Sequence, residues 1–162
     1  MTLDLSPAPH RPALLLSLFL ALALFLSAPS AHAGINEVVP DEHMLSQLEL
    51  RASQAGPREQ CFLYTELVHA ATELAGQQML AGDLENASAS LKRVEHYAQL
   101  IHLGLANDTK RLKNAEMLMH HTTHRLSEYM HAVSSDDRET LQATLKQLNQ
   151  VQDELLAQVF KH

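Results

Sequence analysis

The longest regular pattern of apolar positions lies in the second half of the chain. Steps of alternately three and four residues from Leu84 meet an apolar or aromatic side chain at every position except Asp108 and Thr122. The series is Leu84, Ala87, Leu91, Val94, Ala98, Ile101, Leu105, Asp108, Leu112, Ala115, Met119, Thr122, Leu126, Tyr129 and Val133, and we call it the heptad seam. Heptad spacing sustained over this length is typical of coiled-coil-like helix packing. It predicts helix over 84–133, about 75 Å long if continuous.

Shorter amphipathic segments flank the seam on both sides. Asp41 can cap a helix that runs to about Ala55, and Gly56 and Pro57 can end that helix and begin another over 57–81. After the seam, the capping residues at 134–137 predict the start of a final helix. Its apolar stripe consists of Leu141, Leu145, Leu148, Val151 or Gln152, Leu155 and Val159. We therefore predict an all-α, coiled-coil-like helical bundle.

Two arrangements of these helices fit the pattern. In the first, a continuous central helix over 84–133 has a shorter helix folded back antiparallel from each end. In the second, the chain breaks near 104–108, where Gly104 can end one helix and Asn107 or Asp108 can begin the next, which gives an up-down-up-down four-helix bundle. The unbroken phase of the seam favours the first arrangement. Because that arrangement leaves apolar surface uncovered, it predicts a homodimer formed through the seam.

The start of the chain has the order of features found in secretory signal peptides. His10 and Arg11 precede an apolar stretch from Ala13 to Leu26, and small residues follow up to Ala33. The stretch is shorter than the roughly 20 residues of a membrane-spanning helix. We predict cleavage after Ala33, export to the periplasm or the extracellular medium, and no stable membrane insertion afterwards. The predicted organisation is a signal peptide at 1–33, a linker and short helix at 34–56, and a helical domain at 57–162.

Charge and composition narrow the classes of function. The formal net charge is −7, and it stays there after cleavage because one acidic and one basic residue, Asp4 and Arg11, are removed together. An acidic chain is a poor partner for nucleic acid. Cys61 is the only cysteine, so an internal disulfide is excluded, and a buried small side chain is its simplest role. Without a catalytic motif, we predict a non-enzymatic structural or interaction module with an unidentified protein partner.

Histidine is the unusual component of the composition, with 11 residues in the chain. His120 and His124 lie one helical turn apart, so two imidazoles on one face can chelate Zn, Cu or Ni. Glu116 and Glu128 each lie four residues from one of these histidines and offer oxygen donors. The alternative function is therefore a periplasmic, histidine-based metal-binding or pH-responsive protein. Solvent-exposed histidines without a ligand explain the same spacing.

Overall fold

The computed structural model of the protein describes residues 40–105 and 110–161, except the side chains of residues 136 and 137. These residues lie in the compact unit Val38–His162. Its described elements are the helices α2 (Glu42–Gln54), α3 (Pro57–Leu80), α4 (Leu84–Gly104), α5 (Leu112–Ala132) and α6 (Ser135–Val159). The all-α prediction is confirmed. The predicted signal peptide, its cleavage site and Asp108 lie outside the described residues.

Local sequence signals account for the helix starts. The Asp41 carboxylate accepts a hydrogen bond from the Met44 backbone N–H at 2.7 Å and caps α2, as predicted. Pro57 occupies the first turn of α3, where its missing N–H costs no helical hydrogen bond. Gly82 has a φ of 78°, which only glycine adopts without strain, and it makes the turn from α3 to α4.

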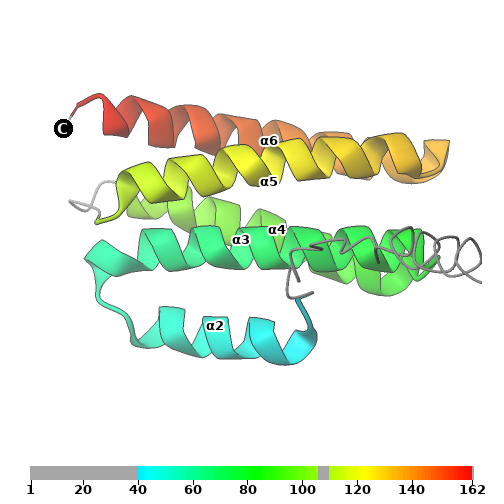
Figure 1. The fold of residues 1–162 in the computed structure, drawn as a ribbon, viewed down its shortest axis with the longest axis horizontal. Helices are drawn as coiled ribbons and strands as arrows, with labels where there is room; N and C mark the ends of the chain where they lie inside the picture. The colour runs from blue at the N-terminus through cyan, green and yellow to red at the C-terminus, as the bar shows by residue number, and fades with distance from the viewer. Residues whose placement is uncertain (1–39, 106–109, 162) are drawn as a thin grey trace, which may run out of the picture. The chain divides into compact units, whose positions relative to one another are not determined.

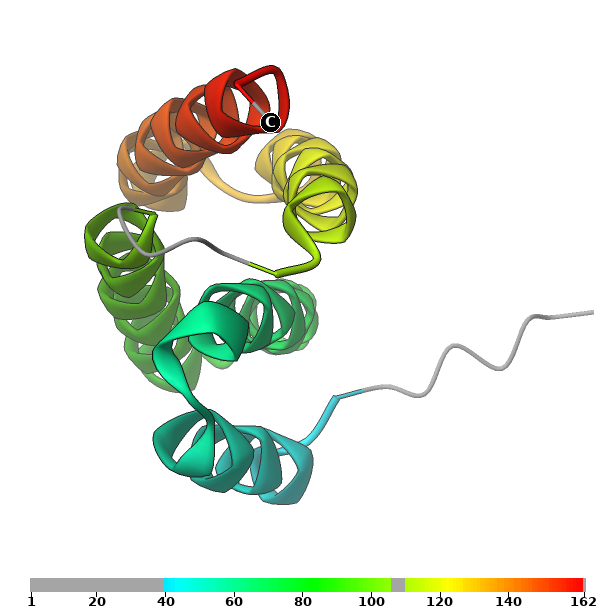
Figure 2. The ribbon, with the colours of Figure 1, turned by 90° about the vertical axis from the view of Figure 1, so that its left-hand side faces the viewer.

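The helices form two antiparallel pairs, α3 with α4 and α5 with α6, and α2 packs against α3 (Figure 1). The pairs lie side by side, with α3 beside α5 and α4 beside α6, as the view along the helices shows (Figure 2). In both junctions, a residue further along one helix contacts a residue further along the other. Helices α3 and α5 therefore run parallel, and so do α4 and α6. Within the described helices, α4 and α5 do not pack on each other.

The prediction of one continuous helix over 84–133 is wrong, and the break that the alternative arrangement placed near 104–108 is present. Helix α4 ends at Gly104, and α5 begins at Leu112 after Arg111, whose φ of 59° lies in the left-handed region. The start of α5 is held against the start of α3. The Lys110 backbone N–H donates to the Arg58 carbonyl at 2.8 Å, and the Arg111 guanidinium lies 3.5 Å from the centre of the Phe62 ring. These contacts hold the first turn of α5 beside α3.

The heptad spacing continues across the break because of the length of the connection. Residues 105–111, between the end of α4 and the start of α5, number seven, which is one heptad. A connection of that length leaves the three-and-four count unchanged, so the sequence pattern alone does not distinguish it from continuous helix.

Most of the heptad seam on α4 and α5 is buried inside the single chain, whereas Leu84 at its start is 49% exposed. Its central members on α4 and α5, Leu91, Val94, Ile101, Met119 and Leu126, are each no more than 2% exposed. One chain therefore covers its own seam, which removes the reason for expecting a second chain there. Self-association itself stays a prediction.

The junction between α3 and α5 includes a close contact at Gly76. A Cβ placed on Gly76 would overlap the ring of Tyr129, whereas a Cβ on Gly104 meets no atom within 4 Å. The absent side chain of Gly76 thus lets the Tyr129 ring lie against the backbone of α3.

We expect Gly76→Ala to lower the free energy of unfolding by about 1–3 kcal/mol, because the added methyl group forces the Tyr129 ring or α5 to move. Urea unfolding followed by circular dichroism measures the change. Gly104→Ala is the matched control, and it should leave stability unchanged or raise it slightly because helical alanine is favoured over glycine. Equal stability of Gly76→Ala and the native protein would contradict the observed packing of Tyr129.

Candidate functional site

A cleft of about 290 Å³ opens between α2, α3 and α4. Helix α2 supplies Glu49, α3 supplies Tyr64, and α4 supplies Tyr97, while aliphatic side chains form the floor. The complete lining is Glu49, Ala52, Ser53, Tyr64, Leu67, Tyr97 and Leu100. The cleft therefore combines aliphatic side chains with one carboxylate and two aromatic rings.

The polar end of the cleft is held by a short hydrogen bond. The Tyr97 hydroxyl donates to Glu49 Oε1 at 2.6 Å. Burial and this bond to a carboxylate raise the pKa of Tyr97 above its usual value. The hydroxyl consequently keeps its proton and holds Glu49 at the cleft, and this contact also ties α2 to α4. Nearby, Arg93 of α4 forms an ion pair with Glu42 of α2 at 2.6 Å.

The two tyrosine rings lie close to parallel. Their centres are 6.1 Å apart with an angle of 15° between the ring planes. Aromatic faces and a carboxylate are the groups that bind an organic cation, through the ring quadrupole and through direct charge attraction. Because Tyr97 is only 8% exposed and also packs against His96, Glu49 and Tyr64 are the groups of this cleft that a guanidinium or ammonium group can reach.

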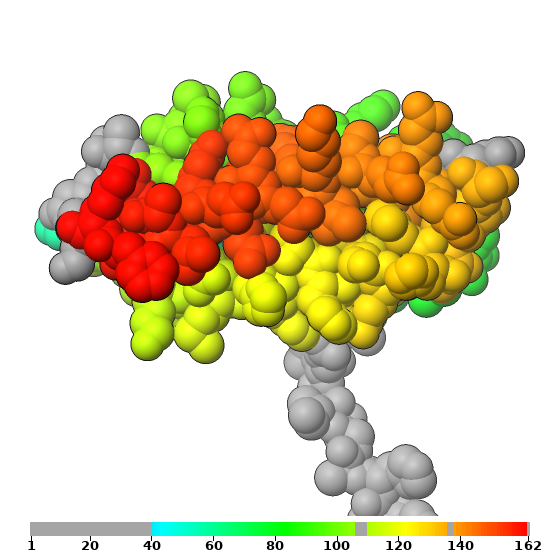
Figure 3. Space-filling view, turned by 90° about the horizontal axis from the view of Figure 1, so that it is seen from above, coloured from blue at the N-terminus to red at the C-terminus, as the bar shows by residue number. Residues whose placement is uncertain are grey.

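The residues predicted to bind metal lie on the exposed side of α5. His120 and His124 are both exposed, in agreement with the solvated face inferred from the sequence. His120 Nδ1 contacts Gln152 Nε2 of α6 at 3.0 Å, and His124 Nδ1 lies 3.5 Å from Glu128 Oε1. Figure 3 shows α5 and α6 side by side on this surface. Glu116 is partly buried on the same helix. Among the described residues, no three His, Cys, Asp or Glu side chains are grouped to hold a metal ion.

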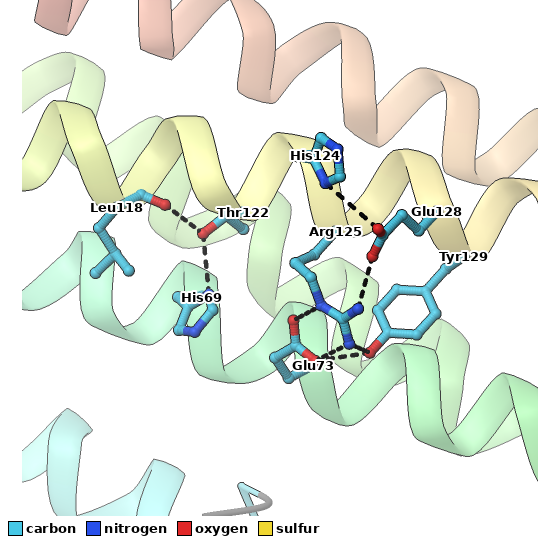
Figure 4. A network of polar contacts seen from close by, with 8 residues as sticks. All are labelled: His69, Glu73, Leu118, Thr122, His124, Arg125, Glu128 and Tyr129. Carbon is cyan, nitrogen blue, oxygen red and sulfur yellow. Dashed lines mark hydrogen bonds and ion pairs between the residues drawn. The ribbon is translucent and has the colours of Figure 1, made fainter. Parts of the chain in front are cut away.

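A polar network between α3 and α5, which no local sequence pattern indicated, joins the two helical pairs (Figure 4). Glu73 is only 4% exposed, and Arg125 binds its two carboxylate oxygens at 2.8 and 3.0 Å. The Tyr129 hydroxyl donates to Glu73 Oε2 at 2.6 Å, and Arg125 also donates to Glu128 at 2.6 Å. Glu128, predicted as a metal ligand, is therefore engaged with both Arg125 and His124.

The pKa of Glu73 is set by opposing effects. Burial alone raises the pKa, but hydrogen bonds from Arg125 and Tyr129, together with the positive charge of Arg125, outweigh burial and bring it below 4.5. The charged carboxylate is thus the form that stabilises the fold. This contribution is present above the unfolded pKa and is lost as the pH falls through the lower pKa of the folded state.

Cys61 has the simple role predicted for it. The side chain is 0% exposed, and burial raises the pKa of its thiol to about 11. The thiol is consequently protonated and inaccessible, so it acts as a small apolar side chain of the core.

No protein-family description, curated protein or solved structure matches this chain. Among the described residues, none of the helices is both long enough and apolar enough to cross a membrane.

We expect Glu73→Gln to lower the free energy of unfolding by about 2 kcal/mol at pH 7. The loss is smaller than for a fully buried ion pair, because the Arg125 side chain is 30% exposed and keeps its bond to Glu128. Urea unfolding at several pH values measures both the loss and its pH dependence. The difference between native protein and variant should shrink as the pH falls below the usual glutamate pKa of the unfolded chain and through the lower pKa of Glu73 in the folded protein.

Glu128→Gln is the matched control, since the Glu128 side chain is 48% exposed and its ion pair is screened by water. That substitution should change stability by less than about 1 kcal/mol. A pH-independent difference for Glu73→Gln, or an equal loss for both variants, would show that Glu73 is not the buried anchor.

Proposed function

We propose that this protein is a non-enzymatic interaction module that acts after export and binds a cationic side chain of a protein partner in the cleft between α2, α3 and α4. The observation that carries the proposal is the convergence of Glu49, Tyr64 and Tyr97 on one cleft. These three residues come from three different helices, and the fold brings them together.

The size of the cleft supports a single side chain as its occupant. Its volume of about 290 Å³ is at the lower limit of small-molecule sites, which span roughly 300–1,000 Å³. An arginine or lysine side chain has an apolar stem for Leu67 and Leu100 and a cationic end for Glu49 and the tyrosine rings. The net charge of −7 also attracts a basic partner over a longer distance.

Export rests on the features of the first 33 residues: a basic start, a short apolar stretch and a small-residue cleavage region ending at Ala33. We propose a periplasmic or extracellular location on that basis. The intact mass of protein secreted from cells that express the full chain tests this step. A chain that begins at Gly34 supports it, and retention of residues 1–33 contradicts it.

We expect N-acetyl-arginine amide to bind in the cleft more tightly than its citrulline counterpart, which has the same length without the charge. The ring resonances of Tyr64 and Tyr97 report binding in an NMR titration. Glu49→Gln should weaken the arginine interaction at least threefold and leave the citrulline interaction unchanged, because it removes one charge and little volume.

Glu85→Gln is a matched control on exposed helical surface away from the cleft lining, and it should bind arginine as the native protein does. The proposal fails if citrulline binds as well as arginine, or if the tyrosine resonances do not respond to either compound. It also fails if both glutamate variants weaken binding equally, since that result indicates general attraction to an acidic surface.

A further inference from the structure

Basic side chains gather at the end of the bundle where α4 and α6 end and α5 begins, and Figure 2 looks onto this end. They are Lys110, Arg111 and Lys113 around the start of α5, and Lys161 just beyond the end of α6, and all four are exposed. Glu59 at the start of α3 pairs with Lys110 at 3.2 Å. In the described part of the chain, Lys113 and Lys161 have no ion-pair partner, so their charges are available to another molecule.

Two large apolar side chains lie at the same end and face solvent. Leu103, in the last turn of α4, is 63% exposed, and Phe160, directly after the end of α6, is 82% exposed. Phe160 is the most exposed of the large hydrophobic side chains in the described residues. Their apolar surface is unfavourable in water and gains free energy when another apolar phase covers it. We call these two residues and the four cations the basic end.

The basic end lies far from the acidic residues at the start of α4. Asp83 and Glu85 are exposed there, and α4 separates them from the basic end by its 21 residues, which span about 32 Å. That distance is several times the Debye length of about 8 Å at physiological ionic strength. The net charge of −7 therefore does not prevent the basic end from attracting an anionic surface.

We propose that the basic end binds peripherally to a lipid bilayer that contains anionic phospholipids. The lysines and Arg111 contact the lipid phosphates, while Phe160 and Leu103 enter the boundary between head groups and acyl chains. Attachment of this kind is reversible and requires no membrane-spanning helix.

The combination of cations with exposed apolar side chains favours a bilayer over other anionic partners. A soluble polyanion attracts the lysines but offers no apolar phase to Phe160. The acidic end of a second copy, with Asp83 and Glu85, also attracts the lysines. Only the lipid surface presents phosphates and an apolar layer within a few ångströms of each other, so only there do both kinds of side chain contribute to binding.

Co-sedimentation with vesicles tests the proposal, using the purified protein that cells produce from the full chain. Vesicles of phosphatidylglycerol and phosphatidylcholine in equal parts are compared with vesicles of phosphatidylcholine alone. We expect binding about tenfold tighter to the anionic vesicles, and weaker binding as salt is added. Lys113→Gln/Lys161→Gln should weaken this binding about tenfold, and Phe160→Ser about fivefold. All three residues are exposed, and circular dichroism confirms that the variants are folded.

Matched controls change the same residue types away from the basic end. Lys92→Gln/Lys146→Gln removes two exposed charges from the middle of α4 and α6, and Leu80→Ser removes an exposed apolar side chain at the end of α3. Both controls should bind the anionic vesicles as the native protein does. Binding through the apolar stretch Ala13–Leu26, where residues 1–33 are retained, is common to all variants and needs no anionic lipid.

The proposal is overturned if the protein binds both kinds of vesicle equally or neither, or if the controls lose as much binding as the variants of the basic end. Unchanged binding of Phe160→Ser indicates attraction to phosphate alone and also contradicts it. If the lysine variant abolishes self-association without changing vesicle binding, the partner of the basic end is a second copy. The arginine-binding cleft contains none of these residues, so failure here is distinguishable from failure of the proposed function.

Discussion

The contact of Glu73 with Arg125 and Tyr129 fixes how the two helical pairs lie against each other. A carboxylate that is 4% exposed needs its partners, and only one register of α5 along α3 supplies both the guanidinium and the hydroxyl. Gly76 is part of the same constraint, because its missing side chain admits the Tyr129 ring. Sliding α5 by one turn would leave Glu73 buried without its ion pair, at a cost of several kcal/mol.

The remaining polar contacts between the pairs follow that register. His69 meets Thr122 in the α3–α5 junction, while Glu95 meets Thr144 and His102 meets Glu154 in the α4–α6 junction. The ring contact between His69 and His121 belongs to the same register. The cleft of Glu49, Tyr64 and Tyr97 depends instead on α2 and on the first helical pair.

The sequence predicted the helical segments and the helix starts at Asp41 and Pro57, because these depend on neighbouring residues, but α5 begins at Leu112 and not at Asn107 or Asp108. It misplaced the connection between α4 and α5, since a seven-residue segment preserves the heptad phase. The cleft and the Glu73 network were not predictable from local spacing. Tyr97 is 48 positions from Glu49, and Arg125 is 52 positions from Glu73, so only the packing of distant helices brings them together.

The chain reverses after Gly104, so that α5 returns alongside α3. Spin labels at Ser88→Cys and His131→Cys test this reversal by pulsed electron–electron double resonance. Both positions are exposed and can be labelled, whereas the buried Cys61 does not react. We expect a distance of about 20 Å, because α4 and α5 lie diagonally across a bundle whose packed neighbours are 8–10 Å apart, and Ser88 and His131 lie at the same end of it. A distance of about 65 Å, as in a continuous helix over 84–133, would contradict it.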